Sequence, residues 1–70
     1  MTICFKDDVT VDVVQGIDQH GNPMVSSEKY QKDDTFEGDL MGDNGHCINF
    51  QFGDGSTIYG LSKNYFTVMN

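Results

Sequence analysis

The sequence predicts an all-β fold of short antiparallel strands. Two dipeptides, Asn44-Gly45 and Asp54-Gly55, favour type I′ hairpin turns, in which both central residues take positive φ. Between them, residues 47–52 (CINFQF) alternate between polar and apolar, as in a strand with one buried face. No segment has helical periodicity of useful length. The stretch 35–61 is therefore expected to form three strands joined by two-residue turns.

Further strands are expected on both sides of this stretch. Val9, Val11 and Val13 share the inward face of one of them, while Val14 breaks the alternation and indicates a bulge or a strand end. The expected flanking strands are Thr2–Phe5, Val9–Val14, Met24–Tyr30 and Tyr65–Met69. Whether residues 1–8 pair with the sheet or form a loose arm stays open.

The connections differ in regularity. Gln15–Ser27 has no clear pattern and contains the turn residues HGNP, so we expect a wide hairpin loop or a long excursion with irregular strand arms. Gln31–Asp34 is a charged turn, and Ser62–Asn64 suits a single 3₁₀ turn. Residues 1–70 are expected to form one domain.

Charge limits the classes of partner. The 70 residues include eleven acidic side chains against four lysines, with a formal net charge of −7. Binding to phosphate backbones or anionic membranes needs cationic side chains, so neither is expected. A protein partner that is basic, or that itself binds nucleic acid, is compatible with this charge. A domain of this size buries only about 60% of its unfolded surface, so we expect a monomer or a weak homodimer.

Two motifs carry a family resemblance. Lys32-Asp33-Asp34 resembles the turn that enters the central strands of SH3 domains, and residues 61–66 (LSKNYF) are similar to their ending, where a 3₁₀ turn precedes the closing strand. The chain thus resembles an SH3-like small β-barrel of five to six strands over residues 9–69, with residues 9–13 as the opening strand. Ser62 stands where the family has a ligand-contacting Pro, and the paired Trp of the central strand is absent.

The first functional hypothesis is a non-enzymatic, acidic protein-interaction module. The resemblance implies a groove between the Gln15–Ser27 loop and the 3₁₀ turn. Tyr65 and Asn64 would form its floor, and Asp18 and Glu28 would select a basic ligand.

The second hypothesis rests on the carboxylates. Glu37 and Asp39 fall on the same face of an expected strand, about 6–7 Å apart. This separation is close to the phosphate spacing of a nucleic-acid strand. The alternative function is therefore an acidic inhibitor, encoded by a phage or mobile element, that mimics nucleic acid on a host DNA-processing enzyme.

Catalysis and metal binding are not expected. His46 and Cys47 are neighbours on a strand and point to opposite faces, so one ion could not easily bind both, and Cys4 and His20 lie far off in the sequence. We expect no enzyme activity, no metal and no cofactor. The amino-terminal residues lack the pattern of a signal peptide, which favours a cytoplasmic protein with reduced thiols.

Overall fold

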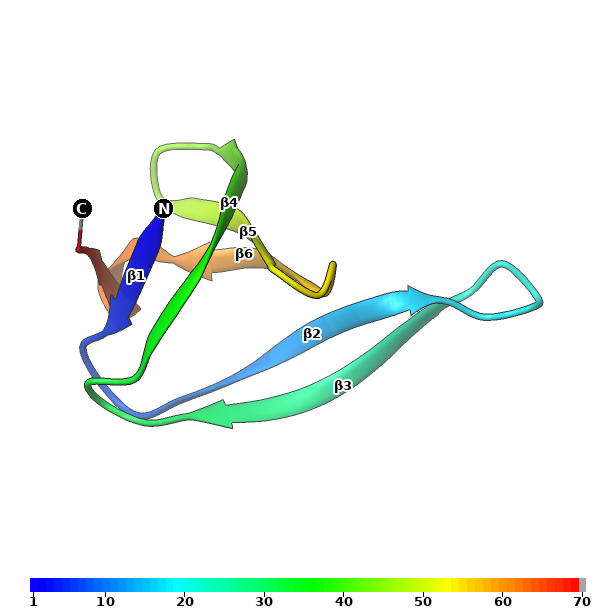
Figure 1. Cartoon of the computed structure of the whole chain (residues 1–70), viewed down its shortest axis with the longest axis horizontal. Coiled ribbons are helices and arrows are strands. Elements are labelled where there is room, and N and C mark those ends of the chain that lie inside the picture. The colour runs from blue at the N-terminus through cyan, green and yellow to red at the C-terminus, as the bar shows by residue number, and fades with distance from the viewer. Residues whose placement is uncertain (70) are drawn as a thin grey trace.

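The computed structural model describes residues 1–69, which form seven β-strands and one 3₁₀ turn (Figure 1). In chain order, the elements are β1 (Thr2–Phe5), β2 (Val9–Ile17), β3 (Pro23–Tyr30), β4 (Thr35–Asp43), β5 (Cys47–Phe52), β6 (Thr57–Ser62), the 3₁₀ turn η1 (Lys63–Tyr65) and β7 (Phe66–Val68). The all-β prediction is confirmed, and η1 lies within one residue of the predicted 3₁₀ turn.

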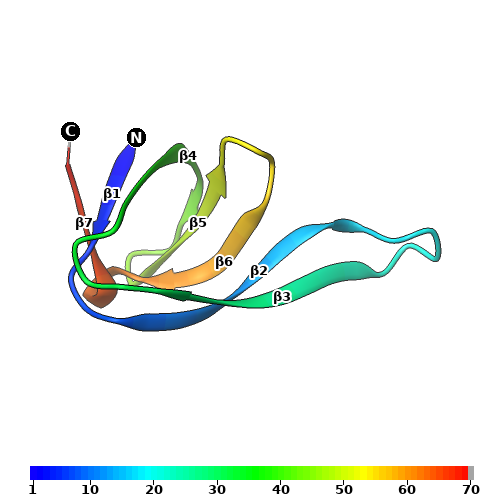
Figure 2. The same cartoon turned by 60° about the horizontal axis from the view of Figure 1, so that its bottom comes forward.

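The strands form one antiparallel sheet in the order β3-β2-β6-β5-β4-β1-β7. Within the described residues this sheet is open, with β3 and β7 at its two edges, so the expected closed barrel is not formed. The reason lies in β2, which pairs with β6 only at Val13 and Val14. Beyond these residues β2 and β3 leave the rest of the sheet as a projecting hairpin (Figures 1 and 2), and β3 is not brought to β7.

β1 is a structural strand and not a loose arm. It lies between β4 and β7, and Ile3 is opposite Phe36 on one side and Val68 on the other. Ile3 and Phe5 are both fully buried. The strand beside the closing strand is thus residues 2–5. The expectation that residues 9–13 form the opening strand is wrong.

The β2–β3 hairpin replaces the irregular loop expected over residues 15–27. The indicated bulge is present: the pairing register shifts between Val14 and Ile17, and Gly16 takes a φ of 142°. At the tip, one carboxylate oxygen of Asp18 accepts hydrogen bonds from the backbone N–H groups of His20 and Asn22, at 2.8 and 2.9 Å. These bonds stabilise a tight turn, so the strands run almost to the tip.

The β4–β5 and β5–β6 turns contain three and four residues, and not two. Gly45 and Gly55 have positive φ, whereas Asn44 and Asp54 do not, so the type I′ prediction is wrong. Asn44 Oδ1 instead accepts hydrogen bonds from the backbone N–H groups of His46 and Cys47, and Asp54 Oδ1 accepts one from that of Ser56, as in Asx turns.

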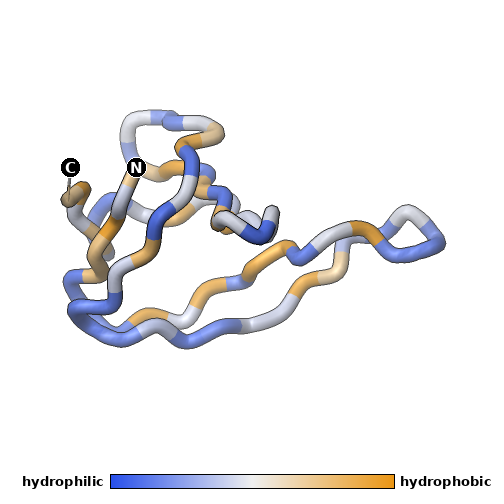
Figure 3. Tube along the Cα trace, in the orientation of Figure 1, coloured by the Kyte–Doolittle hydropathy of each residue, from blue (hydrophilic) through white to orange (hydrophobic). Residues whose placement is uncertain are grey.

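The core lies between β1, the first half of β2, and β4 to β7. Its most buried side chains are Ile3, Phe5, Phe50, Ile58 and Leu61. Apolar and polar residues alternate along much of β2, as Figure 3 shows by colour, and along β5. The expected inward residues of these two strands are confirmed.

Aromatic rings fill the side of the core that faces the hairpin. The ring of Tyr30 stacks on Phe5 at 5.0 Å and meets the edge of Phe36 at the same distance. Phe52 closes the cluster against Phe36 and Phe50. Burial, followed by the nearby carboxylates of Glu28 and Asp54, raises the pKa of the Tyr30 hydroxyl. These rings tie the base of the hairpin to the sheet.

Candidate functional site

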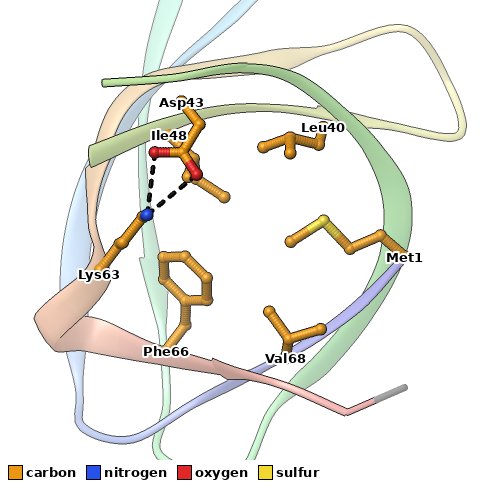
Figure 4. A pocket seen from close by; sticks show the side chains of 7 residues that line it. All are labelled: Met1, Leu40, Asp43, Ile48, Lys63, Phe66 and Val68. Atoms are coloured by element: carbon orange, nitrogen blue, oxygen red, sulfur yellow. Dashed lines mark hydrogen bonds and ion pairs between the residues drawn. The ribbon is translucent and has the colours of Figure 1, made fainter. Parts of the chain in front are cut away.

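A pocket of about 290 Å³ opens at one end of the curved sheet (Figure 4). We call it the β4–β7 pocket, since these strands supply Leu40 on one side and Phe66 and Val68 on another. Its lining residues are Met1, Leu40, Asp43, Ile48, Lys63, Phe66 and Val68. Five of the seven are apolar, which is the usual composition of a pocket that holds an apolar group.

Strand alternation creates the apolar lining. Phe66 and Val68 are two residues apart on β7 and therefore share a face. Phe66 and Ile48 are buried at the base, whereas Leu40 and Val68 are 47% and 53% exposed at the mouth. Leu40 is the last residue before the register shift in the β4–β5 pairing. The base is therefore rigid core, and the mouth offers exposed apolar surface.

An ion pair marks one side of the mouth. Lys63 Nζ lies 2.9 Å from each carboxylate oxygen of Asp43, and the backbone N–H of Gly45 donates a further bond to that carboxylate. The hydrogen bond from Lys63, followed by that from Gly45, lowers the pKa of Asp43. The backbone N–H of Lys63 also bonds to the carbonyl of His46. These contacts hold η1 against the β4–β5 turn.

The lining combines one ion pair with apolar side chains. Its ionisable side chains, Asp43 and Lys63, are paired with each other. The remaining side chains are aliphatic, aromatic or thioether groups that pack without forming strong hydrogen bonds. The pocket can therefore surround one apolar side chain and present a charge of either sign beside it.

The residues predicted for a groove are separated by the structure. Asp18 caps the hairpin tip, at the end of the molecule opposite β7 and the turn that precedes it (Figures 1 and 2). Glu28 is half-buried in β3 and accepts a hydrogen bond from Ser26 Oγ. Asn64 and Tyr65 are exposed on η1, beside the pocket residue Lys63. Asn64 and Tyr65, on η1, are therefore the predicted groove residues that adjoin the pocket.

Glu37 and Asp39 do share an exposed side of β4. Their neighbours on that side are uncharged, because Glu37 lies opposite Thr2 on β1 and Asp39 opposite Gln51 on β5. The acidic ridge on this side of β4 thus consists of two carboxylates flanked by uncharged side chains.

Sequence reasoning missed the pocket as a site. Leu40 and Ile48 lie on the consecutive strands β4 and β5, whereas Phe66 and Val68 lie on β7. The sequence alone does not show that β7 comes close to the other two strands. The position of β1 beside β7 brings Met1 into the lining. The signal available was the LSKNYF motif, since η1 determines where Lys63 and Phe66 lie.

The chemically reactive side chains are dispersed. Cys4 and Cys47 are half-buried free thiols on separate strands, and His20 and His46 lie in exposed turns. Over residues 1–69, no three His, Cys, Asp or Glu side chains come together as metal ligands could. The described part of the chain contains no helix with the length and apolar character needed to span a membrane.

Comparison with known proteins identifies no relative: no family model, no curated protein and no solved structure matches this chain.

Proposed function

We propose that this protein is a non-enzymatic protein-interaction module with an SH3-like strand arrangement. Supporting this arrangement, β4, β5 and β6 form a meander, η1 precedes the last strand, and that strand pairs with the first. In this proposal the β2–β3 hairpin corresponds to the long loop between the first two strands of the family's fold. The open edges remain a departure from a closed barrel.

The observation that carries the functional proposal is the β4–β7 pocket. A rigid base with an exposed apolar mouth is suited to one inserted side chain, such as Leu, Met or Phe, from a partner protein. The net charge of −7 favours a partner segment with lysines or arginines beside that anchor. The proposed ligand is therefore an extended basic segment with one large apolar side chain.

Selection from a displayed library of random peptides tests this proposal. Peptides that the protein enriches are expected to combine an apolar anchor with basic residues, and their affinities are measured by fluorescence anisotropy. Leu40→Glu places a charge at the mouth and should weaken binding at least about tenfold, as expected for an interface anchor. Tyr59→Glu adds the same charge on β6, at a residue that is 63% exposed and does not line the pocket.

The two variants separate the pocket from general electrostatics. Both raise the negative charge by one unit, so a merely electrostatic attraction treats them alike. Equal affinities for Leu40→Glu and Tyr59→Glu, or a selection that enriches no peptide, would refute the pocket as the binding site. Tyr65→Ala, measured with the same peptides, tests the sequence-based prediction that the site extends along η1.

The second candidate function is mimicry of nucleic acid by a protein of phage or mobile-element origin. The observation in its favour is the shared exposed side of Glu37 and Asp39. Its test is competition with DNA for a basic DNA-binding enzyme, followed at increasing salt. Charge reversal at both carboxylates (E37K with D39K) should abolish the competition, whereas Leu40→Glu should not. Competition that survives the double reversal rejects this candidate.

A further inference from the structure

We propose that two copies of this chain associate through β3, whose free edge pairs antiparallel with the β3 edge of a second copy, centred on Ser27. This association is separate from the β4–β7 pocket and does not depend on it.

The first observation is the edge itself. Among the described residues β3 pairs with β2 alone, and its eight residues make it much longer than β7, the three-residue strand at the other edge. The outer side of an edge strand presents unpaired N–H and C=O groups, which are the groups that another strand pairs with. β7 presents few such groups because it is short.

The second observation is the outer half of the hairpin. Past Val14, residues 1–69 supply no third strand to the hairpin, since the β2–β6 pairing ends there (Figure 2). Ile17, Met24 and Val25 on this part are 70%, 47% and 53% exposed. Two strands by themselves are marginally stable in water. A third strand beside β3 would stabilise this segment and cover apolar surface.

Symmetry and charge select the register. A two-fold axis perpendicular to the sheet pairs side chains of the same face. The axis therefore lies between the two β3 strands at a point where one residue is opposite the same residue of the second copy, and we call this residue the centre. With Glu28 or Lys29 as the centre, identical charges lie directly opposite each other. An axis near either end of β3 leaves only a short overlap. Ser26 and Ser27 remain as centres.

The Ser27 centre gives the better side-chain pairs. Met24 then lies opposite Tyr30 of the second copy, which favours a sulfur–aromatic contact with a ring that is half-buried. Val25 lies opposite Lys29 of the second copy and covers its aliphatic stem. With Ser26 as the centre, Met24 would face Glu28 instead. Pro23, which lacks an N–H, falls outside the seven paired residues 24–30.

The two charges on β3 make association possible despite the acidic chain. Glu28 and Lys29 cancel, so the edge itself brings no net charge into the contact. The register further predicts a specific electrostatic response, because position 25 of each copy faces Lys29 of the other. A negative side chain at position 25 should therefore strengthen the dimer, and a positive one should weaken it.

Sedimentation equilibrium of the full chain over micromolar to millimolar concentrations tests the proposal. The wild-type protein is expected to show a concentration-dependent monomer–dimer equilibrium. Val25→Glu and Val25→Lys lose the same contact with Val14, their cross-strand neighbour on β2, and circular dichroism checks that both fold. We expect the dimer dissociation constant to be about tenfold lower for Val25→Glu than for Val25→Lys, since two symmetric contacts change sign.

General repulsion between acidic chains predicts the opposite order, because Val25→Glu raises the net charge to −8 and Val25→Lys lowers it to −6. The opposite order, equal constants, or a monomeric mass at every concentration overturns the proposal.

Disulfide trapping adds a measurement that needs no substitution at position 25. Ser27→Cys should form a disulfide that joins position 27 of one copy to position 27 of the other, identified by peptide mass spectrometry. Asp12→Cys, directly opposite Ser27 on β2 but away from the edge, should form no such link. Equal linking of the two variants also contradicts the register.

Discussion

Gly38 lies on β4 opposite Phe52 of β5, where a Cβ atom has no room. A Cβ atom built at this position would collide with the backbone carbonyl of Gln51 and lie 2.8 Å from Cζ of Phe50. The obstacle is backbone and a fully buried ring, neither of which can move aside cheaply. Replacing Gly38 by Ala should therefore lower the free energy of unfolding by about 3 kcal/mol, at the upper end of overpacking costs, as measured by urea denaturation.

The matched control is Gly53→Ala in the β5–β6 turn. A Cβ at Gly53 has no atom within 4 Å, and its φ is not in the left-handed region. Its stability should stay within about 0.5 kcal/mol of wild type. Equal stability of the two variants would contradict the close packing of β4 against β5 at Gly38.

Asp43, at the pocket mouth, makes the stability of the protein depend on pH. Its pKa lies below the ordinary value of 3.8 because Lys63, and then Gly45, donate hydrogen bonds to the carboxylate. Between the lowered pKa of Asp43 in the folded protein and its ordinary pKa in the unfolded chain, the unfolded chain binds more protons than the folded one. The free energy of unfolding therefore falls as the pH drops through this window. Above 3.8 the contribution is fully present.

Asp43→Asn should therefore be less stable than wild type at neutral pH, and the difference should shrink as the pH falls below 3.8. Urea midpoints measured stepwise across this range for both proteins test the prediction. Effects of Asp54, whose pKa is also lowered, are common to both proteins and cancel in the comparison. A difference that is the same at every pH would contradict the assigned role of the ion pair.

At the scale of elements, β1 is the strand whose role changes most between sequence and structure. Ile3 is fully buried between β4 and β7, so Ile3→Ala removes core volume and should cost about 2–5 kcal/mol. Tyr59→Ala, at an exposed residue of β6, should cost far less. Thermal or urea unfolding measures the stability of both variants. A loose amino-terminal arm would leave Ile3→Ala as stable as wild type.

Alternation predicts strands well where one residue in two is apolar, and poorly where a bulge interrupts the period. β6 shows this plainly. The sequence leaves Ile58, Tyr59 and Leu61 ambiguous, because the register with β5 shifts where Gly60 adopts a φ of 74°. The N–H of Gly60 bonds to the side chain of Asn49, a contact eleven residues distant in the chain. A local pattern does not contain such a contact.

The hairpin shows the same limit. Val14 indicates its bulge, but the sequence does not indicate the paired outer strands, since Gln15–Ser27 contains few apolar residues in a regular order. Backbone bonds between β2 and β3 and the Asp18 cap stabilise the hairpin there, and neither depends on a buried face. The same lack of burial leaves Met24 and Val25 exposed.

At the scale of the whole molecule, its extents of 37 × 21 × 21 Å reflect a compact sheet with one long projection. Strand composition predicts the all-β class, but the order of strands depends on which distant segments pair. The adjacency of β1 and β7 leaves β7 at one edge of the sheet and brings Met1 into the lining of the β4–β7 pocket. No signal in residues 2–5 or 66–68 alone specifies that pairing.

The charge of the molecule acts over the same scale. Asp7, Asp8, Asp33 and Asp34 lie in the two neighbouring turns at the base of the hairpin, where Asp8 and Asp34 cap backbone N–H groups. These caps give part of the acidity a structural role. The remaining carboxylates are dispersed. In the proposed function they favour basic partners in general, and the pocket selects among these partners by the apolar side chain that it accepts.

The most direct test of the proposed function is the methyl NMR spectrum of the protein during titration with a peptide obtained from the library selection. The pocket predicts that the methyl signals of Leu40, Ile48 and Val68 shift together and saturate with one dissociation constant. The methyl signals of Ile17, on the hairpin, should not move. Shifts confined to the hairpin, or to core methyl groups outside the pocket such as those of Ile58, would show that the β4–β7 pocket is not the peptide-binding site.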